Sequence, residues 1–258
     1  MPMKTASTLA AALAAMSINA AAQSYDSYDA FYAAQPDTVF GVPIKQDIDP
    51  NEPTAHVLHS YPDKPGYFTE LHAKLEQKAL TIELWQNRIV VDGKTYRFAR
   101  ATAFPGEHAS NIFPESAEVF VAARANIHPP LVCVEGHGSA SGEASSRYQQ
   151  IFLVMNPLAR RPVFLQLPGL LSSCRAVLVT KDGKLAFPKN SYLFDATQES
   201  RVGLLMSYYT FENQRFVPAL YEIRLRFTRP EVPFQFSVQD KNETASAFAP
   251  QMKKAPRG

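Results

Sequence analysis

Hydrophobic and polar residues alternate with a period of two over much of the chain after residue 80. In the segment EIRLRF, residues 222–227, Ile223, Leu225 and Phe227 alternate with charged residues. Successive side chains of a strand point to opposite faces, so this pattern predicts a half-buried antiparallel strand. Similar patterns predict extended segments at residues 81–98, 131–135, 148–155, 162–167, 174–180, 203–211 and 234–238.

Turn residues separate several of these segments. Asp92-Gly93 and Asp182-Gly183 each lie between two runs of alternating residues, and Glu212–Gln214 separates the runs 203–211 and 219–227. Asp-Gly favours the two-residue turns that match the twist of antiparallel strands. The sequence therefore predicts three hairpins at these positions.

Two segments carry features of helices. In residues 67–80, Phe68, Leu71 and Leu75 recur at helical spacing, which predicts a helix. Residues 114–127 leave both alternatives open. Pro114 at a first helical position and the following alanines favour a helix, whereas the segment EVFVA favours a strand.

These elements predict a mainly β fold. We expect an antiparallel sandwich or a small propeller-like β domain with one or two short helices. The predicted organisation is a signal peptide at 1–22, a Pro/Tyr-rich irregular arm at 23–66, a β-rich domain at 67–240 and a disordered basic tail at 241–258.

The arm contains four prolines that exclude a long helix or an inner strand, namely Pro50, Pro53, Pro62 and Pro65. Such an arm either stays mobile or lies across the folded body. In the second case its apolar contacts would be Phe31, Phe40, Val42 and Ile44.

The first 22 residues predict export. Lys4 precedes an Ala-rich apolar run, and Ala20–Ala22 supply small residues for cleavage. We expect a periplasmic or secreted protein with no transmembrane segment after cleavage. In that oxidising compartment, the two cysteines, Cys133 and Cys174, are predicted to form a disulfide.

Composition limits the partners. Removal of Lys4 with the leader leaves 25 Lys and Arg residues against 24 Asp and Glu residues. A nucleic-acid partner would require a clear excess of positive charge, so we expect none.

The segment CVEGHGSASGEASSRYQ, residues 133–149, gathers most of the candidate chemistry. Gly138–Gly142 resembles the Gly-x-Ser-x-Gly motif of serine hydrolases, but Ala140 occupies the position of the nucleophile. A predicted strand follows the loop, whereas nucleophile elbows and phosphate-binding loops both lead into a helix. Glu135 and His137 could point the same way from a strand, yet no nearby residue supplies a third metal ligand. The sequence therefore predicts neither a metal site nor a cofactor.

The long loop between Glu135 and Ser146 is instead interpreted as a contact surface anchored by Cys133. Its candidate binding residues are Glu135, His137, Ser139, Ser141 and Glu143. The favoured hypothesis is a non-enzymatic protein that binds another protein in the periplasm, as an inhibitor or a toxin-immunity protein does. A cell-envelope hydrolase using His137 with Glu135 or with a nearby serine is one alternative. A structural or assembly component of an envelope complex, docking through its arm and tail, is another.

Overall fold

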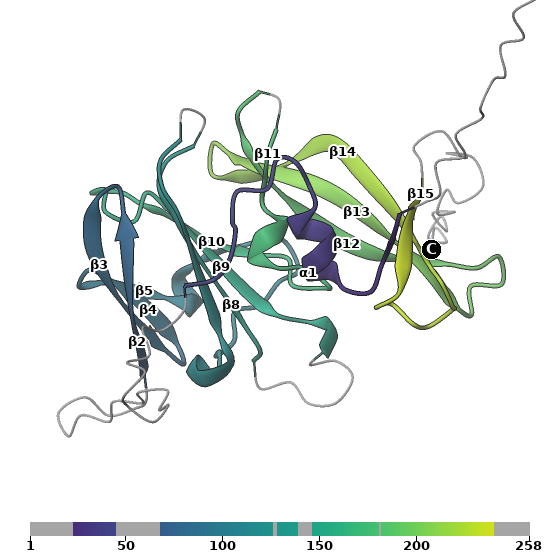
Figure 1. Cartoon of the computed structure of the whole chain (residues 1–258), viewed down its shortest axis with the longest axis horizontal. Coiled ribbons are helices and arrows are strands. Elements are labelled where there is room, and N and C mark those ends of the chain that lie inside the picture. Colours follow the sequence, from purple (N-terminus) through teal and green to yellow (C-terminus); the bar gives the residue numbers. More distant parts are fainter. Residues whose placement is uncertain (1–22, 45–67, 126–127, 139–145, 181, 240–258) are drawn as a thin grey trace, which may run out of the picture.

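The computed structural model describes residues 23–44, 68–125, 128–138, 146–180 and 182–239. Its strands form three sheets that stack as layers, with a five-stranded sheet in the middle (Figure 1). The predicted mainly β class is confirmed. Packing of one sheet on the next corresponds to the sandwich alternative rather than to the propeller-like one.

The first layer is a four-stranded antiparallel meander. Its strands, in the order β2-β3-β4-β5, are β2 (Phe68–Leu75), β3 (Lys78–Trp85), β4 (Arg88–Val91) and β5 (Lys94–Arg97). One face of this meander packs on the central sheet. Leu71 and Ile82 lie in the same buried cluster as Val134 and Phe152 of the central sheet.

The central sheet has the strand order β6-β10-β9-β8-β7. Its strands are β6 (Thr102–Ala103), β7 (Glu118–Ala122), β8 (Leu131–Gly136), β9 (Gln150–Met155) and β10 (Val163–Leu167), with β6 parallel to β10. Every residue of β8 is buried, because both faces of this sheet are covered. Strands covered on both faces have near-continuous apolar runs, as in the segment LVCV of β8.

The third layer is a six-stranded sheet that curls into a half-barrel (Figure 1). In the order β1-β15-β14-β13-β12-β11 its strands are β1 (Ser24–Tyr25), β15 (Phe236–Gln239), β14 (Arg215–Phe227), β13 (Arg201–Glu212), β12 (Leu185–Phe194) and β11 (Leu178–Val179). Ile223, Leu225 and Phe227 are buried, while Glu222 and Arg226 on the opposite face are exposed. The alternation predicted for β14 is therefore confirmed.

The predicted hairpins are also confirmed. Asp92-Gly93 joins β4 to β5, Asp182-Gly183 lies between β11 and β12, and a turn at Asn213-Gln214 joins β13 to β14. Gly93 and Gly183 both have φ of 79°, in the left-handed region that glycine adopts without a steric penalty.

The helix predicted for residues 67–80 is wrong. Residues 68–75 and 78–85 form the hairpin β2–β3 instead, with a two-residue turn at Glu76-Gln77. Leu71, Ala73 and Leu75 alternate toward the central sheet, and both turn residues have positive φ. The apolar spacing fits both periods, and a turn without glycine gives no local cue to decide between them.

Two other segments differ in detail from the prediction. In residues 114–122 the strand alternative is found, because EVFVA forms β7; in place of the helix alternative there is only the 3-10 turn η2 (Pro114–Ser116) before it. The extended segment predicted at 174–180 begins with another 3-10 turn, η3 (Cys174–Ala176), and only Leu178–Val179 is a strand. A third such turn, η1 (Phe98–Arg100), follows β5.

The described part of the arm, residues 23–44, lies across the body. It carries the one α-helix among the described residues, α1 (Tyr28–Ala33), which Ser27 caps by accepting a hydrogen bond from the Ala30 N–H at 3.1 Å. Helix α1 packs on the concave face of the half-barrel, where Phe31 and Tyr32 are fully buried. The remainder of the predicted arm, including its four prolines, lies outside the described residues.

The apolar contacts expected from the arm are found in part. Phe31 and Phe40 are buried and Ile44 is partly buried, whereas Val42 is 81% exposed. The predicted disulfide is confirmed: Cys133 of β8 is bonded to Cys174 of η3. It ties the central sheet to the segment that leads into β11.

Candidate functional site

Glu135 occupies the end of the buried strand β8. It is 4% exposed and points to the same side as Cys133, toward η3, where its carboxylate accepts a hydrogen bond from the Cys174 N–H. Burial raises the pKa of Glu135 to about 8; nearby Asp29 and Glu118 also raise it, while the Cys174 N–H and Arg175 lower it. Glu135 therefore stabilises the base of the loop from the interior, and its side chain offers no surface to a partner.

His137, two residues farther along, is half-buried. Its backbone oxygen accepts a hydrogen bond from the Phe113 N–H at 3.1 Å, and its Nδ1 is buried without a hydrogen-bond partner among the described residues. Ser139, Ser141 and Glu143 lie outside the described residues. Of the five predicted binding residues, the structure thus places two, at the base of the loop.

Neither a metal centre nor a membrane helix is found in the described ranges. Those ranges hold no group of three or more His, Cys, Asp or Glu side chains placed to bind a metal ion. None of the helices described there is long and apolar enough to cross a membrane.

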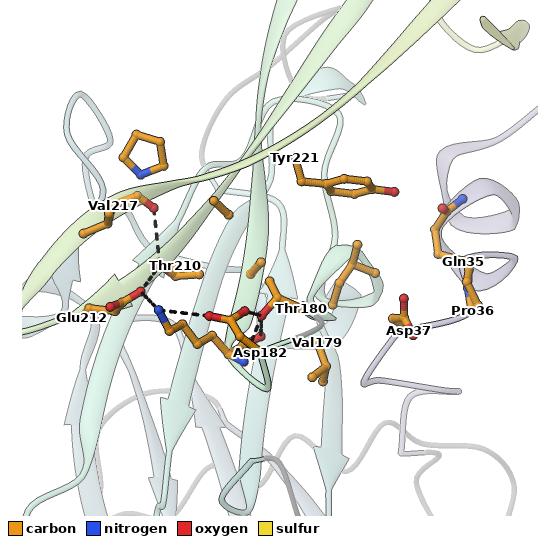
Figure 2. Close-up of a pocket in the computed structure, with 15 residues that line it drawn as sticks. Gln35, Pro36, Asp37, Val179, Thr180, Asp182, Thr210, Glu212, Val217 and Tyr221 are labelled. Carbon is orange, nitrogen blue, oxygen red and sulfur yellow. Dashed lines mark hydrogen bonds and ion pairs between the residues drawn. The ribbon is translucent and has the colours of Figure 1, made fainter. Parts of the chain in front are cut away.

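A groove of about 660 Å³ lies at one end of the half-barrel, and its volume is in the range of ligand sites (Figure 2). Its apolar surface comes from the concave face of the sheet, where Ala186, Ala219 and Leu178 line it. The arm residues 35–37 form one wall, and Tyr221 of β14 lies opposite them. The groove is the part of the concave face that α1 leaves uncovered.

A chain of ion pairs forms the wall of the groove that faces the arm residues 35–37. Lys184 Nζ lies 3.1 Å from Asp182 and 2.9 Å from Glu212, and Thr210 donates a hydrogen bond to the Glu212 carboxylate at 2.8 Å. The side-chain hydrogen bond from Lys184 lowers the pKa of Glu212, and Thr180 followed by Lys184 lowers that of Asp182. Both carboxylates are therefore ionised at neutral pH.

The groove carries an excess of negative charge. Among the described residues, its lining contains three carboxylates (Asp37, Asp182 and Glu212) and one cation, Lys184. Asp37, on the arm, is in no ion pair with a described residue. Burial and then Asp37 raise the pKa of Tyr221, so the Tyr221 hydroxyl is protonated at neutral pH.

The arm shapes this cavity by pairing with both edges of the curled sheet. At one edge Ser24–Tyr25 pairs with β15. At the other edge, the Val179 N–H donates a hydrogen bond to the backbone oxygen of Asp37 at 2.9 Å. The Val39 N–H also donates to the Val177 oxygen at 3.0 Å. An arm fixed at both edges sets the width of the groove.

The groove was not predicted from the sequence. Asp37, Asp182 and Glu212 are far apart along the chain, and only the strand order brings them together. The cue that was present is the capped segment beginning at Ser27 and ending before Pro36, which is typical of a short helix.

Comparison of the chain with protein-family models, with curated proteins and with solved structures gave no match.

Proposed function

We propose that this protein is an exported, non-enzymatic binding protein of the periplasm that takes a basic segment of a partner protein in the groove. The observation that carries the proposal is the pairing of an apolar floor with a surplus of carboxylates in a cavity of about 660 Å³. An inhibitor or toxin-immunity role is the most concrete form of this activity.

The apolar floor favours burial of side chains from the partner. Leu178, Ala186 and Ala219 present small and aliphatic surfaces, and burying apolar area contributes about 25 cal/mol per Å². Val217 at the rim is 39% exposed, so it is available for contact. A segment with aliphatic side chains fits this floor.

The negative charge of the groove favours a cationic segment. Lys184 already pairs with two of the carboxylates, which leaves Asp37 to meet a Lys or Arg of the partner across the groove from the ion pairs (Figure 2). Complementary charge raises association rates and selects against acidic competitors.

The groove is open at the edge of β14. Strand β15 pairs with β14 only at residues 224–227, so no described strand covers the outer edge beside Val217 and Tyr221. A chain can therefore enter from this side without opening a sheet. Pro218, which lacks an N–H, limits repeated strand pairing at the same edge.

The test uses labelled decapeptides of alternating Leu and Lys, with alternating Leu and Glu as the charge control. Fluorescence anisotropy is expected to give saturable binding of the Leu/Lys peptide and much weaker binding of the Leu/Glu peptide. Equal affinity for the two peptides, or no binding of either, would contradict the proposal.

Paired variants at the rim locate the binding. Val217→Arg is expected to weaken Leu/Lys binding several-fold and Val217→Glu to strengthen it, because the position is exposed and lines the groove. Ala79→Arg, at an exposed position of β3 in another sheet, is the matched control and leaves the affinity unchanged. If all three variants behaved alike, the peptide would not be in the groove.

The loop hypothesis is tested separately. Because β8 ends at Gly136 and the His137 backbone oxygen accepts a hydrogen bond from the Phe113 N–H, the replacement begins after Gly138. Residues 139–145 are replaced by a Gly/Ser linker of equal length. Loss of Leu/Lys binding in this variant, with the Val217 variants unchanged, would assign the contact to Ser139, Ser141 and Glu143 instead.

A further inference from the structure

A second cavity, about 430 Å³ in volume, lies along the free edge of β5. The sheet that contains β5 and the half-barrel that contains the groove lie on opposite sides of the central sheet. The second cavity is lined by Lys94, Thr95, Tyr96, Arg97, Arg100, Pro162 and Phe164. Strand β5 is the last strand of the four-stranded sheet, and Phe164 belongs to β10 of the central sheet. The cavity, named here the basic hollow, therefore opens where two layers of the sandwich separate.

Positive charge is concentrated in the basic hollow. Lys94, Arg97 and Arg100 line it, and its lining contains no carboxylate from the part of the chain that the structure describes. None of the three cations is in an ion pair with a described residue. Asp92, near Lys94 in the sequence, is already paired with Lys78. The molecule as a whole is nearly neutral, so this local excess of cations is a specific feature of the β5 edge.

Two backbone N–H groups point into the same space. The Phe98 N–H donates a hydrogen bond to the Asn87 backbone oxygen at 3.0 Å. The backbone N–H of Tyr96, two residues earlier, therefore also points toward β4. Antiparallel pairing alternates, and the N–H groups of Thr95 and Arg97 therefore point to the free edge. No described residue accepts a hydrogen bond from either.

Cross-strand pairing places a further arginine beside the hollow and makes the electrostatic potential at this edge more positive. Arg97 lies directly opposite Arg88 on β4, an arrangement of like charges that is destabilising by itself. Arg88 is held over the Trp85 ring, 4.0 Å from its centroid, and Arg97 has no comparable partner among the described residues. An anion in the hollow would offset the repulsion.

The wall opposite the cations is apolar and fixed. Tyr96 donates a hydrogen bond to the Pro157 oxygen at 2.7 Å and packs edge-on against Phe164, with ring centroids 5.5 Å apart. Lys94 donates to the Ala159 oxygen at 2.7 Å, which holds the loop between β9 and β10 against β5. The apolar wall of the hollow and Lys94 are therefore held in place, while the side chains of Arg97 and Arg100 are exposed at its rim.

We propose that the basic hollow binds a compact phosphate-bearing ligand. The guanidinium groups of Arg97 and Arg100 match phosphate oxygens in a bidentate manner, and Lys94 adds a point charge. The N–H groups of Thr95 and Arg97 supply the fixed donors seen in backbone anion sites. A volume of about 430 Å³ is large enough for a phosphorylated sugar or a short polyphosphate.

Inorganic tripolyphosphate serves as the soluble probe, with titration calorimetry as the measurement. The wild-type chain is expected to bind it, and Arg97→Ala/Arg100→Ala is expected to weaken binding at least about tenfold. Arg226→Ala/Arg229→Ala removes the same charge from exposed positions of the half-barrel and is expected to leave the affinity within about twofold. Arg97→Lys/Arg100→Lys keeps the charge without the planar fork and is expected to bind with intermediate affinity.

Vesicles distinguish a soluble ligand from a lipid headgroup. Phosphatidylglycerol vesicles are compared with phosphatidylcholine vesicles in a flotation assay with the same variants. Binding to vesicles alone, lost in Arg97→Ala/Arg100→Ala, assigns the phosphate to a lipid. The proposal is overturned if the wild-type chain binds neither probe, or if both double alanine variants weaken binding equally.

Discussion

The groove of the half-barrel and the basic hollow at β5 are both open cavities, but their charges are arranged differently. In the groove, Lys184 is held between Asp182 and Glu212, and the surplus charge is negative. In the hollow, Lys94, Arg97 and Arg100 have no ion-pair partner among the described residues. Side chains that form ion pairs with one another mainly hold the wall of a cavity in place. Charged side chains without an ion-pair partner attract a ligand of opposite charge.

The two cavities also differ in what supports them. The hollow is formed by the edges of two packed sheets. The groove depends on the arm and on β11, a strand of two residues joined to the central sheet through η3 and its disulfide. We therefore expect perturbations of η3 to affect the groove and to spare the hollow.

Removal of the disulfide should give the largest effect. Cys133→Ala/Cys174→Ala opens a link between residues 41 apart, and the chain-entropy model gives a loss of about 4 kcal/mol in the free energy of unfolding. Urea unfolding measures the loss, while binding of the Leu/Lys peptide should weaken and binding of tripolyphosphate should not. Equal weakening for both ligands would mean that the two cavities share their support.

Loss of the Glu135 proton at rising pH should give the next largest effect on stability. Its pKa of about 8 in the folded chain exceeds the ordinary value of 4.5, so the folded state holds a proton that the unfolded state has lost over this interval. The contribution of Glu135 to the free energy of unfolding is therefore fully present below pH 4.5. It is lost as the pH rises toward 8, by a few kcal/mol in total.

The measurement is the free energy of unfolding of wild type and Glu135→Gln between pH 5 and pH 9. The glutamine keeps an acceptor for the Cys174 N–H but does not titrate, so its stability profile should lose this slope. Glu222→Gln, on the exposed face of β14, is the control and should retain the slope. A Glu135→Gln profile as steep as that of wild type would show that another group titrates.

Neutralisation of Lys184 should give the smallest effect on stability. Lys184 is exposed, so Lys184→Gln is expected to leave the thermal midpoint nearly unchanged. It frees Asp182 and Glu212, and the affinity for the Leu/Lys peptide should rise several-fold. A fall in that affinity would mean that Lys184 itself contacts the peptide.

Local patterns were sufficient to predict much of the β structure. Asp-Gly marks turns through the positive φ that glycine permits, and the alternation in β14 separates its buried row from its charged row. The disulfide followed from the compartment and from a count of two cysteines. These features depend on neighbouring residues or on composition alone.

The β2–β3 hairpin and the two cavities could not be predicted in the same way. Leu71 and Leu75 fit a helix and a strand equally well, and tertiary packing on the central sheet decides between them. Glu135 looked like an accessible carboxylate because nothing local shows that both faces of β8 are covered. Asp37 and Arg97 became site residues only through the order of strands in their sheets.

We propose that the chain carries two separate sites for ligands of opposite charge. Backbone amide shifts in a ¹⁵N-labelled sample, titrated first with the Leu/Lys peptide and then with tripolyphosphate, test it directly. The peptide should shift Val179, Thr210 and Ala219, and tripolyphosphate should shift Thr95, Arg97 and Arg100, each without disturbing the other set. Overlapping sets of shifted residues, or shifts spread evenly over exposed charges, would contradict the claim.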